Sequence, residues 1–168
     1  MSDVAAPDFA TSSQDLHDAL KSQTRESQPS FFRLRAQLPM QGRTNVPLAA
    51  SEKMWVVLKT YAADGENELH AHPNEDHVFV VLQGRASFRG PREEERTIGV
   101  NEGVLLPHGA FYWFKAVGEE PLVMLRVAAA AFEGVDRHGR INIKGEPMPG
   151  DSAENKNVKP VMSDTWFG

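Results

Sequence analysis

Three of the six histidines in this chain lie within eight residues, in the stretch HAHPNEDH that precedes an apolar run. His70 and His72 are two residues apart, so on a β-strand their side chains would point to the same face. Residues 73–76 are typical of a four-residue turn, and the residues that flank such a turn oppose each other across a hairpin. His77 would then lie opposite His72, and three neutral imidazoles would converge where they could bind a divalent cation.

The alternative is that this stretch is a solvated surface turn, because histidines are common in loops. Two observations favour a metal site. The third histidine stands where a hairpin would bring it back to the other two, and the chain contains no cysteine. A bound metal would therefore be held by nitrogen and oxygen atoms, and a triad of histidines would leave coordination positions open for a substrate.

The composition excludes several other classes of function. The chain has 168 residues, of which 40% are hydrophobic, and this is enough for the core of one globular domain. Its formal net charge of -5 gives no electrostatic signature for binding nucleic acid or an anionic membrane surface. The first residues lack the basic and apolar pattern of a secretory signal. We therefore expect a cytoplasmic protein that acts on a small molecule.

Short apolar or alternating runs, separated by turn residues, begin near residue 31 and continue to residue 132. Many short strands at close spacing predict an all-β sandwich or barrel. Residues 12–23 have helical spacing of leucine and alanine and predict one short helix. We divide the chain into an N-terminal extension with this helix (1–30), a β-barrel (31–132) and an extended polar tail packed on the barrel (133–168).

The histidine stretch resembles the first of two sequence motifs of the cupin superfamily. That motif contains an HxH pair, a glutamate and a final glycine. Here His70 and His72 match the pair, and Gly84 matches the final glycine. His77 occupies the position of the glutamate, and Gly65 lies one residue closer to the pair than the motif requires.

A second stretch, NEGVLLPHGAFYWFKA, resembles the second cupin motif. Pro107 and Gly109 match its proline and its second glycine. Asn101, Tyr112 and Ala116 stand where the motif has a glycine, a histidine and an asparagine, respectively. The resemblance covers residues 54–130, and two of the four residues that bind metal in the family are replaced.

The resemblance implies a cupin-like antiparallel β-barrel or jelly roll whose mouth holds one divalent metal per chain. Iron(II) is the favoured metal, and zinc, nickel and manganese also occur in the family. The expected metal ligands are His70, His72, His77 and Tyr112. The phenol of Tyr112 would bind the metal or act beside it as an acid or base, and the alternative is a core tyrosine with its hydroxyl hydrogen-bonded.

Four residues are expected to line the substrate pocket: Phe79, Val81, His108 and Phe114. His108 lies at a turn near the same mouth, where it would contact the substrate or be exposed. Glu75 is expected to form the turn, and it would replace His77 as a ligand if that imidazole pointed away. The run VFVVL is apolar on both faces, which predicts an outer face covered by another sheet or by a partner subunit, and we expect a homodimer.

These features predict an enzyme, a mononuclear non-haem iron dioxygenase that acts on a small anionic or enolisable metabolite such as a 1,3-dicarbonyl compound. Three neutral imidazoles leave the double charge of the metal uncompensated, which favours an anionic substrate. Two alternatives remain. The first is a metal-dependent lyase or isomerase, and the second is a non-catalytic cupin that binds a small ligand or a metal.

Overall fold

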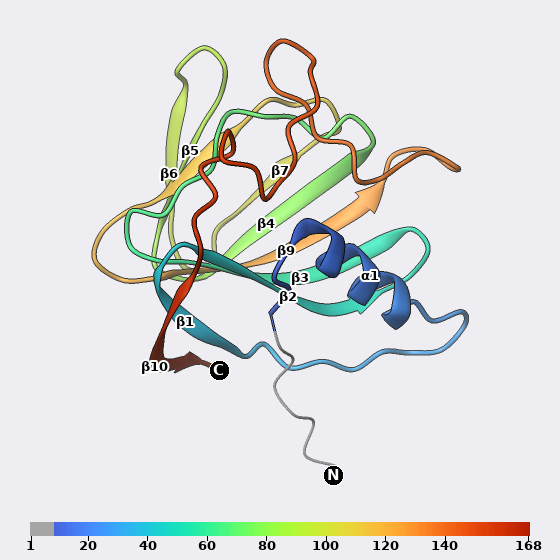
Figure 1. The fold of residues 1–168 in the computed structure, drawn as a ribbon, viewed down its shortest axis with the longest axis horizontal. Helices are drawn as coiled ribbons and strands as arrows, with labels where there is room; N and C mark the ends of the chain where they lie inside the picture. The colour runs from blue at the N-terminus through green and yellow to red at the C-terminus, as the bar shows by residue number, and fades with distance from the viewer. Residues whose placement is uncertain (1–8) are drawn as a thin grey trace.

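The computed structural model describes residues 9–168, which form one short helix and ten β-strands (Figure 1). The helix is α1 (Ser13–Gln23), and it begins where the side chain of Ser12 accepts a hydrogen bond from the backbone N–H of Asp15. The sequence prediction of an all-β fold with one short helix is confirmed. The strands are β1 (Ala36–Gln41), β2 (Arg43–Ala50), β3 (Met54–Tyr61), β4 (Glu75–Gln83), β5 (Ala86–Arg89), β6 (Glu95–Ile98), β7 (Gly103–Leu106), β8 (Trp113–Ala116), β9 (Leu122–Ala130) and β10 (Val161–Phe167).

Every pair of neighbouring strands is antiparallel, and the strands form three sheets. The largest has the order β2-β3-β9-β4-β7, a second has the order β6-β5-β8, and β1 pairs with β10. The two larger sheets enclose an apolar cluster. It includes Phe79 and Val81 from β4, Phe114 from β8, and Leu122 and Met124 from β9. This cluster holds the two sheets together as the halves of a barrel.

The inner face of the large sheet carries charged side chains beyond this cluster. Lys59 on β3 pairs with Asn45 on β2 and with Met124 on β9, so these three residues share a face. Arg126 on β9 pairs with Phe79 on β4 and therefore also faces the barrel interior. One end of the interior is thus apolar, and the other is polar.

The outer face of the large sheet is covered unevenly. Residues of β1, among them Ala36 and Leu38, pack against the outer side chains of β2, β3 and β9. At the β4–β7 end of the sheet, Val78 and Leu105 oppose each other and are 36% and 64% exposed. An apolar patch therefore remains open at this end.

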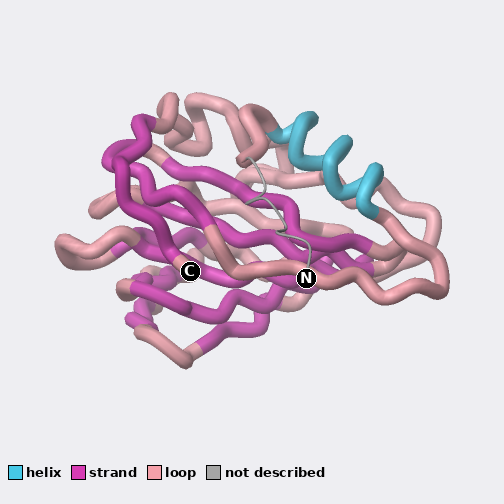
Figure 2. The backbone as a smooth tube through the Cα atoms, turned by 90° about the horizontal axis from the view of Figure 1, so that it is seen from below, coloured by secondary structure: helices cyan, strands magenta, loops and turns pink. Residues whose placement is uncertain are grey.

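The segment after residue 132 crosses the barrel and returns to β1 (Figure 1). Ile141 forms a backbone bridge with Ala71, and the carbonyl of Arg140 accepts a hydrogen bond from the N–H of Met148. The segment ends in β10, so it is held against the barrel at several points. Figure 2 shows α1 packed along the side of the strands, where Leu16 and Leu20 contact Trp55 and Val57. Within residues 9–168, α1 is too short and too polar to cross a membrane.

Candidate metal centre and cavity

The first two histidines of the motif lie in a short segment that is paired on both sides. The backbone of His70 exchanges two hydrogen bonds with that of Tyr112, and Ala71 exchanges two with Ile141. His77 lies in β4, where its cross-strand partners are Leu106 and Ala128. The predicted hairpin between His72 and His77 therefore does not form, because β4 already begins at residue 75 and pairs with β7 and β9.

The imidazole rings nevertheless converge as predicted. The ring centroids of His70 and His72 are 5.0 Å apart, and those of His72 and His77 are 4.1 Å apart. Tyr112 completes the cluster, since its ring centroid lies 4.5 Å from that of His70. In the described part of the chain, His72, Glu75 and His77 offer ligand atoms that all lie within 4.8 Å of one another. These three buried residues form a group that could hold a divalent metal.

Hydrogen bonds to the protein define which ring nitrogens remain free. Nδ1 of His70 donates to the backbone carbonyl of Glu68 at 2.7 Å, which leaves a lone pair on Nε2. This Nε2 is buried and has no hydrogen-bond partner in residues 9–168. Nε2 of His77 lies 3.0 Å from a carboxylate oxygen of Glu75, and the hydroxyl of Tyr112 lies 3.4 Å from Nδ1 of His77.

Glu75 is the most heavily contacted polar side chain of the site. Its Oε1 accepts a charge-assisted hydrogen bond from Nε of Arg137 at 2.9 Å, and Nη2 of Arg126 lies 3.5 Å from its Oε2. Arg137 also stacks on the ring of Trp55 at 3.9 Å. Burial alone would raise the pKa of Glu75, but the hydrogen bond from His77 and the charges of Arg126 and Arg137 hold this pKa below its usual range. Glu75 is thus ionised, and it fixes the orientation of the His77 ring.

Burial keeps the three imidazoles neutral. Loss of hydration, followed by the positive charge of Arg126, lowers the pKa of His77 from 6.5 to about 4. Burial also lowers the pKa values of His70 and His72 well below 6.5. It raises the pKa of Tyr112 far above its usual range, so this phenol keeps its proton. The cluster therefore presents neutral nitrogen donors, the protonation state in which imidazole binds metals.

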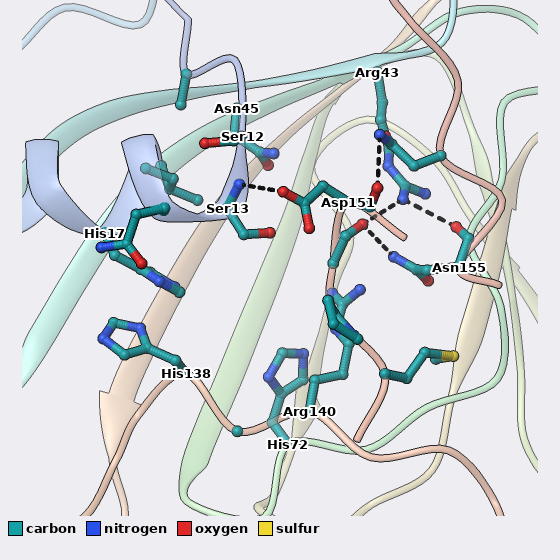
Figure 3. Close-up of a pocket in the computed structure, with 18 of the residues that line it drawn as sticks. Ser12, Ser13, His17, Arg43, Asn45, His72, His138, Arg140, Asp151 and Asn155 are labelled. Carbon is teal, nitrogen blue, oxygen red and sulfur yellow. Dashed lines mark hydrogen bonds between the residues drawn. The ribbon is translucent and has the colours of Figure 1, made fainter. Parts of the chain in front are cut away.

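A cavity of about 520 Å³ lies beside this cluster, between α1, the inner face of β2, β3 and β9, and the segment that crosses the barrel (Figure 3). His72 and Glu75 form part of its wall, and His17 and His138 lie together at another part with their ring centroids 3.4 Å apart. Five cationic side chains line the cavity, against three carboxylates. The cations are Arg43, Lys59, Arg126, Arg137 and Arg140, and the carboxylates are those of Glu75, Asp136 and Asp151.

The sequence of part of the barrel is similar to a known family. Residues 57–128 match the family model described as the cupin domain, and this stretch contains the three histidines of the cluster and Tyr112. Residues 57–128 form a cupin domain. No curated protein matches the chain significantly.

Solved structures of other proteins have the same fold over more than half of this chain. KdgF from Halomonas sp. is 18% identical with a TM-score of 0.52, and the alignment covers 61% of this chain and 94% of KdgF. An RmlC-like cupin from Shewanella frigidimarina is 15% identical with a TM-score of 0.52, and the alignment covers 66% of this chain and 96% of that protein. The protein TT1209 from Thermus thermophilus is 26% identical with a TM-score of 0.52, over 58% of this chain and 91% of TT1209.

The four residues predicted to line the substrate pocket lie elsewhere in this cupin. Phe79, Val81 and Phe114 belong to the buried apolar cluster, behind Tyr112. His108 is at the surface, where its backbone and its ring both contact the carboxylate of Asp76. None of the four is among the described residues that line the cavity. The inner face of the barrel is apolar around these residues and polar beside the cavity.

Several residues of the cavity were not predicted from the sequence. Lys59 and Arg126 each interrupt an apolar strand, and a charge inside such a run is a signal that could have identified them. Glu75 was assigned to a turn, but it is the first residue of β4 and is buried. Arg137 and Arg140 lie in a polar segment without periodicity, and nothing local marks them.

The neutral, buried imidazoles predict a pH dependence for the stability of this cupin without bound metal. Between pH 6.5 and about 4, the unfolded chain binds a proton at His77 and the folded chain does not, so stability falls as the pH falls. From pH 6.5 to about 5, we expect His77 alone to account for a loss of roughly 2 kcal/mol. Urea unfolding of chelator-treated protein measures this loss, and the variant His77→Asn should show a shallower slope. A stability that does not change over this interval would contradict the burial of neutral imidazoles.

Proposed function

We propose that this cupin is a mononuclear metal-dependent enzyme, namely a non-haem iron dioxygenase that acts on a small anionic or enolisable metabolite such as a 1,3-dicarbonyl compound. One observation carries the proposal: a buried cluster of neutral imidazoles adjoins, through His72, a cavity with an excess of cationic side chains. The imidazoles suit a divalent metal, and the cations suit an anionic substrate.

We propose His70, His72 and His77 as the metal ligands. Nε2 of His70 is a buried lone pair without a partner in the described residues, and such an atom is costly unless it binds something. Both oxygens of Glu75 are already occupied by Arg137, Arg126 and His77. Glu75 therefore has the role of a carboxylate that orients a ligand, holding Nε2–H of His77 so that the lone pair of Nδ1, which now lies 3.4 Å from the Tyr112 hydroxyl, is available to the metal.

The same geometry offers a second ligand set. His72, Glu75 and His77 form the group with ligand atoms within 4.8 Å of one another. Two histidines and one carboxylate are also a common arrangement for non-haem iron(II). The two sets share His72 and His77 and differ in the third ligand, His70 or Glu75.

The donor set fits one divalent metal, with iron(II) favoured over zinc, nickel or manganese. Nitrogen ligands without thiolate suit several of these metals. Bound iron(II) would supply a Lewis acid and a position for dioxygen. With three neutral ligands its double charge stays uncompensated, and this favours an anionic substrate group in an open position.

The side chains of the cavity have defined roles in this proposal. The cations bind and orient the substrate, while α1 and the crossing segment enclose the space and limit access of water. Tyr112 keeps its proton and lies beside His77, where its hydroxyl can donate a hydrogen bond to a developing negative charge. The same hydroxyl favours a second candidate, a metal-dependent lyase or isomerase, since such enzymes also stabilise an enolate.

We also propose that the protein forms a homodimer through the open end of the large sheet. Val78 and Leu105 are exposed on the outer face of β4 and β7, where the cover provided by β1 ends. Burial of this patch against a second copy would remove apolar surface from water on both chains. The patch lies on the opposite face of the sheet from the inward-facing His77, so the two copies would have separate sites.

The ligand proposal predicts distinct results for two variants. His70→Ala should fold but lose metal affinity by several powers of ten, because one of three protein ligands is gone. Glu75→Gln should keep the metal with affinity lowered about 10- to 100-fold, because only the orientation of His77 is weakened. Elemental analysis and competition with a chelator measure both effects, and melting curves confirm folding. His108→Ala removes an imidazole outside the cluster and is the control. A metal-free Glu75→Gln protein, together with full occupancy in His70→Ala, would show that Glu75 is the third ligand.

The reaction is tested by oxygen consumption after anaerobic reconstitution with iron(II). We expect uptake on exposure to air with at least one member of a panel of 1,3-dicarbonyl, thiol and phenolic compounds. His77→Ala should consume none, and Tyr112→Phe should keep its iron but react more slowly. Conversion of a panel compound without oxygen uptake would support the lyase or isomerase. A protein that binds metal but converts nothing would favour the non-catalytic alternative.

The homodimer is tested by light scattering on the eluted protein. The expected mass is twice the 18.6 kDa of the chain. Leu105→Lys should give a monomer, because it places a charge in the centre of the patch. Ile143 is similarly exposed but lies in the crossing segment, so Ile143→Lys should remain dimeric. A wild-type protein that elutes with the mass of one chain would exclude this interface.

A further inference from the structure

The cavity contains three cationic side chains that are not themselves proposed metal ligands. Lys59 on β3 and Arg126 on β9 face the barrel interior and are only 7% and 8% exposed. Arg140 reaches the same cavity from the segment that crosses the barrel (Figure 3). Three elements that are distant in the sequence thus each bring one cation to a single enclosed space.

The described chain neutralises this cluster only in part, through the contact between Arg126 and Glu75. The ammonium group of Lys59 donates to the neutral amide oxygen of Asn45 at 2.7 Å, and within residues 9–168 neither Lys59 nor Arg140 forms an ion pair. Nε of Arg126 and Nη1 of Arg140 are buried donors without an acceptor in the same residues. Buried charges and donors of this kind are costly unless a partner satisfies them.

The carboxylates of the cavity wall are already engaged. Glu75 accepts from Arg137 and His77, as described above. A carboxylate oxygen of Asp151 accepts from the backbone N–H of Ser13 at the start of α1, at 3.0 Å. Oδ1 of Asp136 accepts from the backbone N–H of His138. The free donors of Arg126 and Arg140 are therefore available to an acceptor from outside the described chain.

The positive charges around Lys59 change the pKa of its ammonium group. Burial, followed by the charges of Arg126, Arg43 and Arg140, lowers the pKa of Lys59 well below 10.5. A bound anion would oppose each of these charge contributions. An oxyanion also matches the fork of donors that a guanidinium group presents.

We infer that Lys59, Arg126 and Arg140 form a subsite for a carboxylate group of the substrate, separate from the group that the metal would bind. The inference rests on the proposed function for the position of that other group. On the inner face, His77 pairs with Ala128 and Phe79 pairs with Arg126, so the backbone positions of His77 and Arg126 are two residues apart along the strands, about 7 Å. The substrate class is therefore a short dicarboxylic or keto-dicarboxylic acid, whose size suits a cavity of about 520 Å³.

Isothermal titration calorimetry of the full chain with simple anions tests the subsite directly. The probes are malonate, succinate, acetate and inorganic phosphate, each added to the protein as purified and again after removal of metal by a chelator. Lys59→Met and Arg140→Met remove one cation each and keep the aliphatic volume. Lys53→Met and Arg96→Met remove exposed cations away from the cavity and are the matched controls. Arg126 is left intact because it also contacts Glu75.

We expect the wild-type protein with its metal to bind malonate or succinate at least 10-fold more tightly than acetate, because only a dicarboxylate reaches both the subsite and the metal. Lys59→Met and Arg140→Met should each weaken this binding at least 10-fold, while the two controls should bind as the wild type does. Melting curves of each variant separate loss of the subsite from loss of folding. If a variant is unfolded, Lys59→Gln or Arg140→Gln replaces it.

Three results would overturn the inference: no binding of any anion, binding that both cavity variants retain, or a preference for phosphate over the dicarboxylates. Metal content is measured on the same samples. Full metal occupancy without anion binding would reject the subsite and leave the proposed function standing. Anion binding by a protein that takes up no metal would reject the proposed function and leave the subsite standing.

Discussion

The buried carboxylate of Glu75 is the interaction on which the arrangement of the cavity depends. It accepts from Arg137 in the crossing segment, lies beside Arg126 on β9, and contacts His77 on its own strand. A buried charge of this kind is tolerable only when its partners stay in place. The carboxylate therefore fixes the ring of His77, the path of the crossing segment and the side chain of Arg126 relative to one another. Loss of this one charge would leave two buried guanidinium groups without compensation.

The barrel interior is divided between two kinds of packing, and the division explains how a polar site can exist in a small domain. Phe79, Phe114 and their neighbours fill one end with aromatic rings that contact one another at centroid distances near 5–6 Å. The other end cannot be filled in this way, because Lys59 and Arg126 occupy inward positions on β3 and β9. The apolar end stabilises the fold, and the polar end is left for chemistry.

The sequence predicted those features that depend on local patterns. The strands and the helix at residues 12–23 follow from periodicity and turn residues, and the convergence of His70, His72 and His77 followed from their spacing. The reason given for that convergence was wrong, since His77 pairs with β7 and β9 instead of opposing His72. The cations of the cavity were not predicted. Arg137 and Arg140 depend on the path of a long segment over the barrel, and that path is set by distant contacts, which leave no local signal.

The pairing of β1 with β10 has a consequence for how the protein folds. It joins residues far apart in the sequence, as in the hydrogen bond from Gln37 to the carbonyl of Ser163, 126 residues away. Closing so long a loop costs chain entropy before its contacts are gained, so this pairing forms late and depends on the barrel beneath it. Until then the edge of β1 is unpaired and can recruit a strand from another molecule. Strand exchange between copies during refolding at high concentration is thus the characteristic hazard of this architecture.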